Sequence, residues 1–142
     1  LGQPRQAIGH FEQALRIEPN HAEAHVILGS VLFDQGKVPE AIGHWERALQ
    51  IKPTFAAAHY NLANAHLRVG RFEEAIEHYN QALRIEPNYA AAHVNLGITL
   101  EQVGRVQAAI EHYEQAVLLR PDLVDVQKRL SQLRAGARLK VD

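Results

Sequence analysis

Histidine is the residue type in this 142-residue chain that most invites a chemical interpretation, because nine are present. Four of them repeat at one interval: His10, His44, His78 and His112. Three more repeat at the same interval: His25, His59 and His93. Imidazole is a common ligand of transition metals and a general base near neutral pH. The two series therefore raise the question of a metal site or an acid–base site.

Their spacing argues against a shared metal ion. Equivalent positions on packed helices lie at least about 8–10 Å apart, whereas zinc ligands lie about 2.0–2.1 Å from the ion. His21 and His25 stand four residues apart and could supply two ligands, but no third is evident. Glu40 with His44, like Glu74 with His78, more simply predicts a helix-stabilising pair. We expect no metal and no cofactor.

Nucleophilic catalysis has few residues to draw on. The chain has no cysteine, and Ser30 and Ser131 are its two serines. Neither lies in a strained turn, and no glycine-rich phosphate loop or paired carboxylate cluster occurs. We therefore predict no catalytic residue and no enzyme activity.

A fixed interval organises the whole chain. Prolines recur every 34 residues: Pro19, Pro53, Pro87 and Pro121. Glycines keep the same step at Gly2, Gly36, Gly70 and Gly104, and Gly136 arrives two residues early. An interval of this length is typical of stacked structural repeats.

Each repeat is predicted to form two antiparallel helices. The apolar or small residues His25, Leu28, Gly29 and Leu32 share one helical face. The second helix repeats this pattern from Val38 to Leu49. Glycine between the helices can adopt the left-handed conformation, and proline ends the second helix. The residues that follow the prolines predict N-caps at Asn20, Thr54, Asn88 and Asp122. Alanines at fixed positions, such as Ala41 and Ala48, predict close helix packing against large aromatic side chains.

The pattern of leucine, glycine or alanine, aromatic and proline residues resembles the tetratricopeptide repeat family over residues 2 to about 135. The resemblance implies an all-α, right-handed α-solenoid of helix hairpins. We predict one domain made of a half repeat (1–21, the second helix only), three repeats (22–55, 56–89, 90–123), a capping helix (124–135) and a tail (136–142). Histidines replace the tryptophan that the family often has at the fourth position.

Charge and hydropathy exclude several partner classes. The net charge is −1 and the pI about 6.8, so no electrostatic field favours nucleic acid. The chain contains no run of about 18 apolar residues, so we predict no membrane insertion. The start of the chain lacks the features of a signal peptide and is not Met, which indicates a piece of a longer protein. We expect a soluble protein, with the cytoplasm favoured over other compartments.

The resemblance implies a protein-interaction scaffold that binds an extended peptide in a concave groove lined by the first helices. Groove candidates are Asn61, Asn64, Asn95, Tyr60, Arg68, Gln102, Lys128 and Arg129. An asparagine amide offers a donor and an acceptor to a peptide backbone. Asn61 and Asn95 resemble the asparagine ladder of the O-linked N-acetylglucosamine transferase repeats, although Ile27 interrupts it. The structural alternative is that these asparagines are solvated surface residues.

A second family mode, the carboxylate clamp, holds the C-terminal carboxylate of a partner with basic groove residues. Arg68, Lys128, Arg129 and Asn64 could contribute to one. The match is poor, because two of these residues lie in the predicted capping helix.

Self-association is the alternative function. The half repeat lacks its first helix, so Ala7, Ile8, Phe11, Ala14 and Leu15 are expected to present an uncovered apolar stripe. A second copy of the chain could cover Ile8, Phe11 and Leu15, and burial of such side chains contributes several kcal/mol, about 1.5–3 each.

The histidines at the fourth position of each repeat are expected to fill a buried site and bond a neighbouring polar group. Burial would lower the pKa of His25, His59 and His93 below about 6.5. Stability should then fall as the pH drops below about 6.5.

Overall fold

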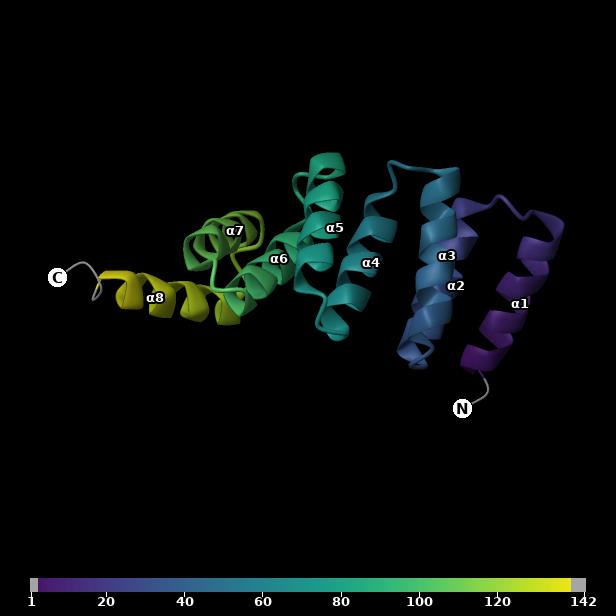
Figure 1. The fold of residues 1–142 in the computed structure, drawn as a ribbon, viewed down its shortest axis with the longest axis horizontal. Helices are drawn as coiled ribbons and strands as arrows, with labels where there is room; N and C mark the ends of the chain where they lie inside the picture. Colours follow the sequence, from purple (N-terminus) through teal and green to yellow (C-terminus); the bar gives the residue numbers. More distant parts are fainter. Residues whose placement is uncertain (1–2, 139–142) are drawn as a thin grey trace.

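The computed structural model describes residues 3–138, which fold into eight α-helices and no strand. The helices are α1 (Gln3–Ile17), α2 (Ala22–Asp34), α3 (Val38–Ile51), α4 (Ala56–Arg68), α5 (Phe72–Ile85), α6 (Ala90–Gln102), α7 (Val106–Leu119) and α8 (Val124–Arg138). Figure 1 shows them stacked side by side, with α1 and α8 at opposite ends. The predicted all-α solenoid of helix hairpins is confirmed.

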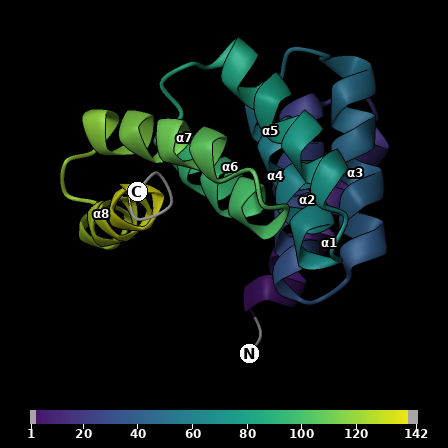
Figure 2. The same ribbon diagram turned by 60° about the vertical axis from the view of Figure 1, so that its left-hand side comes forward.

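Two kinds of helix alternate along the stack. We call α2, α4, α6 and α8 the A helices, and α1, α3, α5 and α7 the B helices. The A helices α2, α4 and α6 each pack most extensively on the B helix that follows, and each B helix packs on the next A helix, so that α8 packs on α7. The hairpins turn relative to one another, so that α3 is upright in Figure 1 whereas α8 lies across the page, and Figure 2 shows α8 nearly end-on.

The turns within the hairpins depend on glycine, as predicted. Gly36, Gly70 and Gly104 have φ values of +79°, +77° and +76°. Most side chains disfavour this left-handed conformation because their Cβ clashes with the backbone, and glycine has no Cβ. These glycines therefore close α2, α4 and α6 sharply enough for the following B helix to fold back on each of them.

The predicted N-caps are wrong by one residue in the three full repeats. The caps are His21, Phe55 and Tyr89, and only His21 caps with its side chain, by accepting a hydrogen bond from the Ala24 amide at 3.2 Å. Asn20 instead lies in a turn that a hydrogen bond from the His21 amide to the Glu18 carbonyl closes. Proline pre-sets φ for such a turn, and the turn includes the residue after it. The helix therefore begins one position later than the cap preference suggests.

The core combines small residues with large aromatic side chains. On the B helices α3, α5 and α7, two alanines of each helix are completely buried: Ala41 and Ala48, Ala75 and Ala82, and Ala109 and Ala116. At Gly29 an added Cβ would lie 2.5 Å from the Trp45 ring, and at Gly97 it would lie 2.5 Å from the Tyr113 ring. Only glycine lets these rings approach the A-helix backbone, which explains the small residue at this repeat position.

The two ends of the stack differ from expectation. Helix α8 was predicted over 124–135 but continues to Arg138, and Gly136 lies inside it instead of in a turn; residues 139–142 of the predicted tail lie outside the described residues. The stripe on α1 is not fully uncovered, because Ile8, Phe11 and Leu15 are half-buried against α2 and its neighbours. A B helix has two apolar faces, and only one of them needs the A helix of its own repeat.

Among the residues that the structure describes, no helix combines the length and apolar character that crossing a membrane requires.

Candidate functional site

The candidate site is the surface on which the A helices follow one another, which we call the A face. It contains repeat positions 2, 6, 9 and 13, counted from the first residue of each A helix. On α4 these residues are Ala57, Asn61, Asn64 and Arg68, and on α6 they are Ala91, Asn95, Ile98 and Gln102. Hydrogen bonds between successive A helices run along this face.

The groove asparagines hold neighbouring repeats together. Asn61 donates from Nδ2 to Ser30 Oγ at 3.2 Å, which joins α4 to α2. Asn95 donates from Nδ2 to Asn64 Oδ1 at 2.9 Å, which joins α6 to α4. In both pairs position 6 donates to position 9 of the preceding repeat. The amide NH₂ groups are therefore engaged within the chain, while the Oδ1 atoms of Asn61 and Asn95 have no hydrogen-bond partner among the described residues.

Two tyrosine hydroxyls form hydrogen bonds with these asparagine side chains. Asn95 Nδ2 also donates to the Tyr60 hydroxyl at 3.1 Å, and Tyr79 donates its hydroxyl to Asn64 Oδ1 at 2.6 Å. The Tyr60 ring packs against the rings of Tyr79 and Tyr89, with centroids 6.0 and 4.8 Å away. Burial raises the pKa of Tyr79 above its usual value, and burial together with Tyr60 raises the pKa of Tyr89 to about 12. The Tyr79 hydroxyl therefore stays neutral and donates its hydrogen bond to Asn64.

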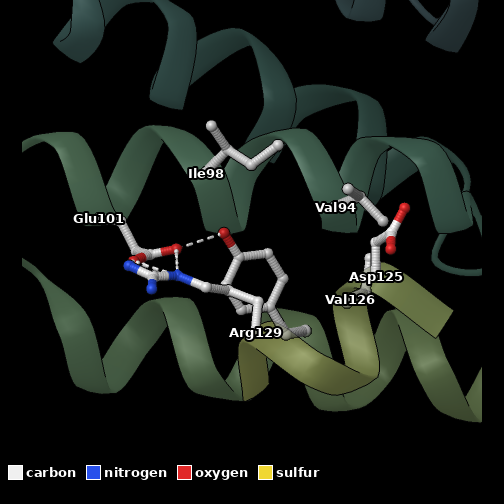
Figure 3. A pocket seen from close by; sticks show the side chains of 7 residues that line it. Val94, Ile98, Glu101, Asp125, Val126 and Arg129 are labelled. Atoms are coloured by element: carbon white, nitrogen blue, oxygen red, sulfur yellow. Dashed lines mark hydrogen bonds and ion pairs between the residues drawn. The ribbon is translucent and has the colours of Figure 1, made fainter. Parts of the chain in front are cut away.

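A pocket of about 350 Å³ opens on the A face where the row of amides ends (Figure 3). Its lining residues come from three helices: Val94, Ile98 and Glu101 of α6, Tyr113 of α7, and Asp125, Val126 and Arg129 of α8. Figure 3 shows Ile98 and Val94 above Arg129 and Val126, with Glu101 at one side of the pocket and Asp125 at the other. It is an apolar recess with a polar rim.

Glu101 fixes one side of the pocket. Its carboxylate accepts hydrogen bonds from Arg129 Nε at 3.0 and 3.2 Å and forms an ion pair with the same guanidinium. It also accepts the Tyr113 hydroxyl at 2.7 Å. The hydrogen bonds from Arg129, and next those from Tyr113, hold the pKa of Glu101 below its usual value, although partial burial opposes them. Glu101 is therefore ionised at neutral pH and compensates the charge of Arg129.

The structure unites only part of the predicted groove set. Asn64, Asn95 and Tyr60 form one hydrogen-bonded group, Asn61 bonds Ser30 on the preceding repeat, and Arg129 reaches the pocket. Arg68 lies over the Phe33 ring, with its Cζ atom 4.9 Å from the centroid. The side chains of Gln102 and Lys128 are exposed and form no hydrogen bond with another described residue.

Sequence reasoning missed Glu101 and Tyr113 as site residues. Glu101 occupies a repeat position that is Phe33 and Leu67 in the earlier repeats. An acidic residue that breaks an apolar series, followed 28 residues later by Arg129, was the available signal. The importance of Tyr113 had no signal, because every B helix has an aromatic residue there.

The histidines form one pair in each full repeat. His25 and His44 approach through their Nδ1 atoms at 2.9 Å, and the same contact joins His59 to His78 at 3.1 Å and His93 to His112 at 2.9 Å. His25 Nε2 lies 3.0 Å from the Pro19 carbonyl oxygen, which only accepts, so Nε2 donates. In the neutral pair Nδ1 of His25 then accepts and Nδ1 of His44 donates.

The pairs correct the expected partners of His44 and His78 and extend the expected pKa shifts to further histidines. His44 and His78 bond the A helix of their own repeat, and not Glu40 and Glu74 on their own helix. Burial, followed by the adjacent histidines, lowers the pKa of His44, His78 and His112, and burial lowers the pKa of His59. The lowered pKa predicted for His59 is thus found, and the pKa is also lowered at His44, His78 and His112, where no shift was predicted.

Within residues 3–138 no three histidine or acidic side chains come together in a geometry that could hold a metal ion. His21 uses its Nδ1 to cap α2, and His25 bonds Pro19 and His44, so the two-ligand candidate His21 and His25 has other partners.

Known structures resemble this fold closely. A crystal structure of MamA shares 26% identity and a TM-score of 0.88, over 97% of this chain and 81% of MamA. A second MamA structure has 26% identity and a TM-score of 0.86, over 97% and 75%. The first TPR of Spaghetti (RPAP3) bound to the HSP90 peptide SRMEEVD has 23% identity and a TM-score of 0.78, over 82% and 93%.

Sequence profiles agree with the structural likeness. No curated protein matches the chain significantly. Profiles described as tetratricopeptide repeat match residues 1–44 and 54–121, and one described as TPR repeat matches residues 29–70. These matches, the 34-residue interval and the stacked hairpins lead to one conclusion: the chain belongs to the tetratricopeptide repeat family.

Proposed function

We propose that the A face binds an extended segment of another protein, so that the chain acts as a protein-interaction scaffold and not as an enzyme. The observation that carries the proposal is the exposure of large apolar side chains among polar groups on this face. Ile27 and Ile98 occupy A-face positions and are 44% and 40% exposed. Ile98 lines one pocket together with Val94 and Val126, beside the charged residues Glu101, Asp125 and Arg129, and a contiguous apolar patch with a polar rim is typical of a binding site for a protein segment.

The asparagine row supports the same proposal in a narrower form than the sequence suggested. Asn95 uses both of its N–H groups, for Tyr60 and Asn64, so it offers a partner only an acceptor, whereas Asn61 uses one N–H for Ser30 and keeps the other. Their Oδ1 atoms remain available as acceptors for backbone N–H groups of an extended segment. Each such hydrogen bond contributes only about 1 kcal/mol, so apolar anchoring must supply the rest of the affinity.

The surroundings of the two groove arginines make a carboxylate clamp a less favoured mode of binding than backbone and apolar contacts. Arg129 is compensated by Glu101, and Arg68 lies over the Phe33 ring on a different repeat. The peptide in the solved RPAP3 structure supports peptide binding by a chain of this fold, while the chemistry of the groove here favours backbone and apolar contacts.

A random peptide library displayed on phage tests the proposal. Selection on the immobilised chain should enrich peptides that lose at least about tenfold in affinity when Ile27→Glu and Ile98→Glu are combined. Both positions are exposed, so the double variant should keep the helical circular-dichroism spectrum and the melting temperature. Failure to enrich any peptide, or peptides that bind the double variant equally well, would reject the A face as a binding site.

Self-association through α1 is a second candidate, favoured by a specific observation. In the full repeats the B-helix position of Ala14 is held by Ala48, Ala82 and Ala116, which are all 0% exposed. Ala14 itself is exposed, and Ile17 is 76% exposed. If a second copy covers this face, light scattering should show a dimer that Ala14→Glu converts to a monomer. Extending the chain by a preceding helix should have the same effect, and a wild-type monomer would remove this candidate.

A further inference from the structure

We propose that the pocket between α6 and α8 takes one bulky aliphatic or aromatic side chain of the bound segment, and that Asp125 selects a neighbouring lysine or arginine in that segment. This inference rests on the proposed function of the A face. It adds the chemistry of the partner, which the fold leaves open.

The pocket exists because the row of amides stops at Ile98. In the earlier repeats, position 9 is Ser30 or Asn64, and it accepts a hydrogen bond from the asparagine at position 6 of the next repeat. Ile98 has no acceptor, and the next position 6 is Arg129, which turns to Glu101 instead. The side chains that would close the surface between α6 and α8 therefore diverge and leave the recess open.

The walls of the recess define the side chain that fits. Val94, Ile98 and Val126 provide apolar walls around a volume of about 350 Å³, as Figure 3 shows for the three side chains. Ile98 is 40% exposed in the free protein, so a ligand side chain that covers it removes apolar surface from water. A leucine, isoleucine or phenylalanine side chain meets this requirement, and a charged or small polar side chain does not.

The rim carries one uncompensated negative charge. The charge of Arg129 is compensated by Glu101, whose other carboxylate oxygen accepts the Tyr113 hydroxyl. Asp125 forms no ion pair with any residue that the structure describes, and Lys128 on the next turn of α8 neither pairs with it nor lines the pocket. Because opposite charges attract across a binding surface, a basic residue beside the apolar anchor is favoured over an acidic one.

The sequences of peptides selected from the phage library read out both parts of the proposal. We expect enriched peptides to share an aliphatic or aromatic residue next to a lysine or arginine. Ile98→Glu should weaken the best peptide at least about tenfold. The matched control is Ile27→Glu, which places the same charge at an equally exposed A-face isoleucine outside the pocket and should weaken that peptide less.

Asp125 is tested by a change in preference as well as by a loss of affinity. Selection on Asp125→Lys should replace the basic neighbour by aspartate or glutamate, and Asp125→Asn should reduce the effect of salt on peptide affinity. Asp125 also lies in the first turn of α8, so the melting temperature of both variants must be compared with that of the wild type. A purely structural role would lower the melting temperature and leave the selected charge unchanged.

The outcomes separate this inference from the proposed function. Peptides that bind the A face but are indifferent to Ile98→Glu, or that keep the same neighbouring charge on Asp125→Lys, overturn the inference and leave the scaffold function standing. Failure to select any A-face peptide overturns both. Both the inference and the proposed function are supported if the selected peptides share an apolar residue beside a lysine or arginine, lose affinity with Ile98→Glu, and change their preferred charge with Asp125→Lys.

Discussion

The two ends of the stack present opposite solutions to the same problem, because each end helix lacks a neighbour among the described residues. Helix α8 packs Val126, Leu130 and Leu133 against the preceding repeat. At the positions where other A helices face a B helix, it has exposed polar residues, namely Gln127, Ser131 and Arg134. Helix α1 keeps the apolar residue types of an interior B helix at Ala7, Phe11 and Ala14, although Phe11 is only half-buried and Ala14 is exposed.

A repeat stack can therefore end through polar side chains at a few positions of its last helix, without any change of fold. Gln127 illustrates this point. It donates from Nε2 to the Pro121 carbonyl at 2.7 Å, where His25 makes the equivalent bond to Pro19. The local turn is therefore preserved while the ring that would pack on a following B helix is absent. A terminal repeat with a polar outer face is the arrangement that keeps a solenoid end soluble.

The largest expected effect on stability comes from comparing the same substitution at one repeat position in two helices, the interior helix α3 and the end helix α1. Ala48→Glu puts a carboxylate at a position that is 0% exposed, and burial of an unpaired charge costs about 3–5 kcal/mol. Ala14→Glu should cost no more than about 0.5 kcal/mol because Ala14 is exposed. Urea unfolding followed by circular dichroism measures both. Equal losses would mean that α1 is covered as fully as α3.

The second test compares the inner and outer faces of α8. Leu130 is 6% exposed, so Leu130→Ala should reduce the free energy of unfolding by about 2–5 kcal/mol. Ser131 is exposed and bonds only the Gln127 carbonyl of its own helix, so Ser131→Ala should change it by less than about 0.5 kcal/mol. The same urea titrations apply, and a large cost at Ser131 would show that the outer face of α8 is not a solvent-facing cap.

The third test uses the histidine pairs of the full repeats. Helix α8 has a glutamine, Gln127, at the repeat position of His25, His59 and His93. The pKa values of His44, His59, His78 and His112 are lowered in the folded chain, so the unfolded chain binds more protons below about pH 6.5. Stability is then greatest above that pH and falls as the pH drops toward the folded pKa values. We expect a lower melting temperature at about pH 5.5 than at about pH 7.5.

A glutamine supplies the control for this pH dependence. His59→Gln copies the residue of α8 and keeps a donor for the Pro53 carbonyl. It removes one titrating partner of His78, whose other charged or titratable neighbours are His66 and Glu77. The melting temperature of this variant should depend less steeply on pH. A wild-type melting temperature that is constant over this range would contradict the role of the pairs.

The smallest effect should come from the ion pair that ties α8 to α6. Glu101→Gln removes the carboxylate that holds Arg129, and Arg129 is largely exposed, so the urea midpoint should shift slightly and the shift should fade in high salt. The pKa of Glu101 is lowered, so its contribution is present above its unfolded value and is lost as the pH falls through the folded value. Arg120→Ala, which breaks an exposed pair with Asp122, is the matched control and should have no measurable effect.

Particular residues show where sequence reasoning succeeded and where it stopped. The glycine turns at Gly36, Gly70 and Gly104 and the buried alanines were predictable, because each depends on one residue type at one repeat position. The histidine pairs were not predicted, although His25 and His44 stand at the same spacing as His59 and His78. Spacing places two rings on facing helices, but it does not say which of their nitrogen atoms meet.

The interval, the two helices of each repeat, the turns between them and the apolar faces could all be read from the order of residues, because these features follow from local conformational preference and from helical periodicity. The tertiary structure alone decided that the asparagine NH₂ groups bond neighbouring repeats, that Arg129 turns to Glu101, and that a pocket opens beside Ile98. Those contacts depend on the angle between successive hairpins. A small rotation there decides whether a long side chain reaches a partner on the next helix, and the pattern of residues along the chain does not specify that rotation.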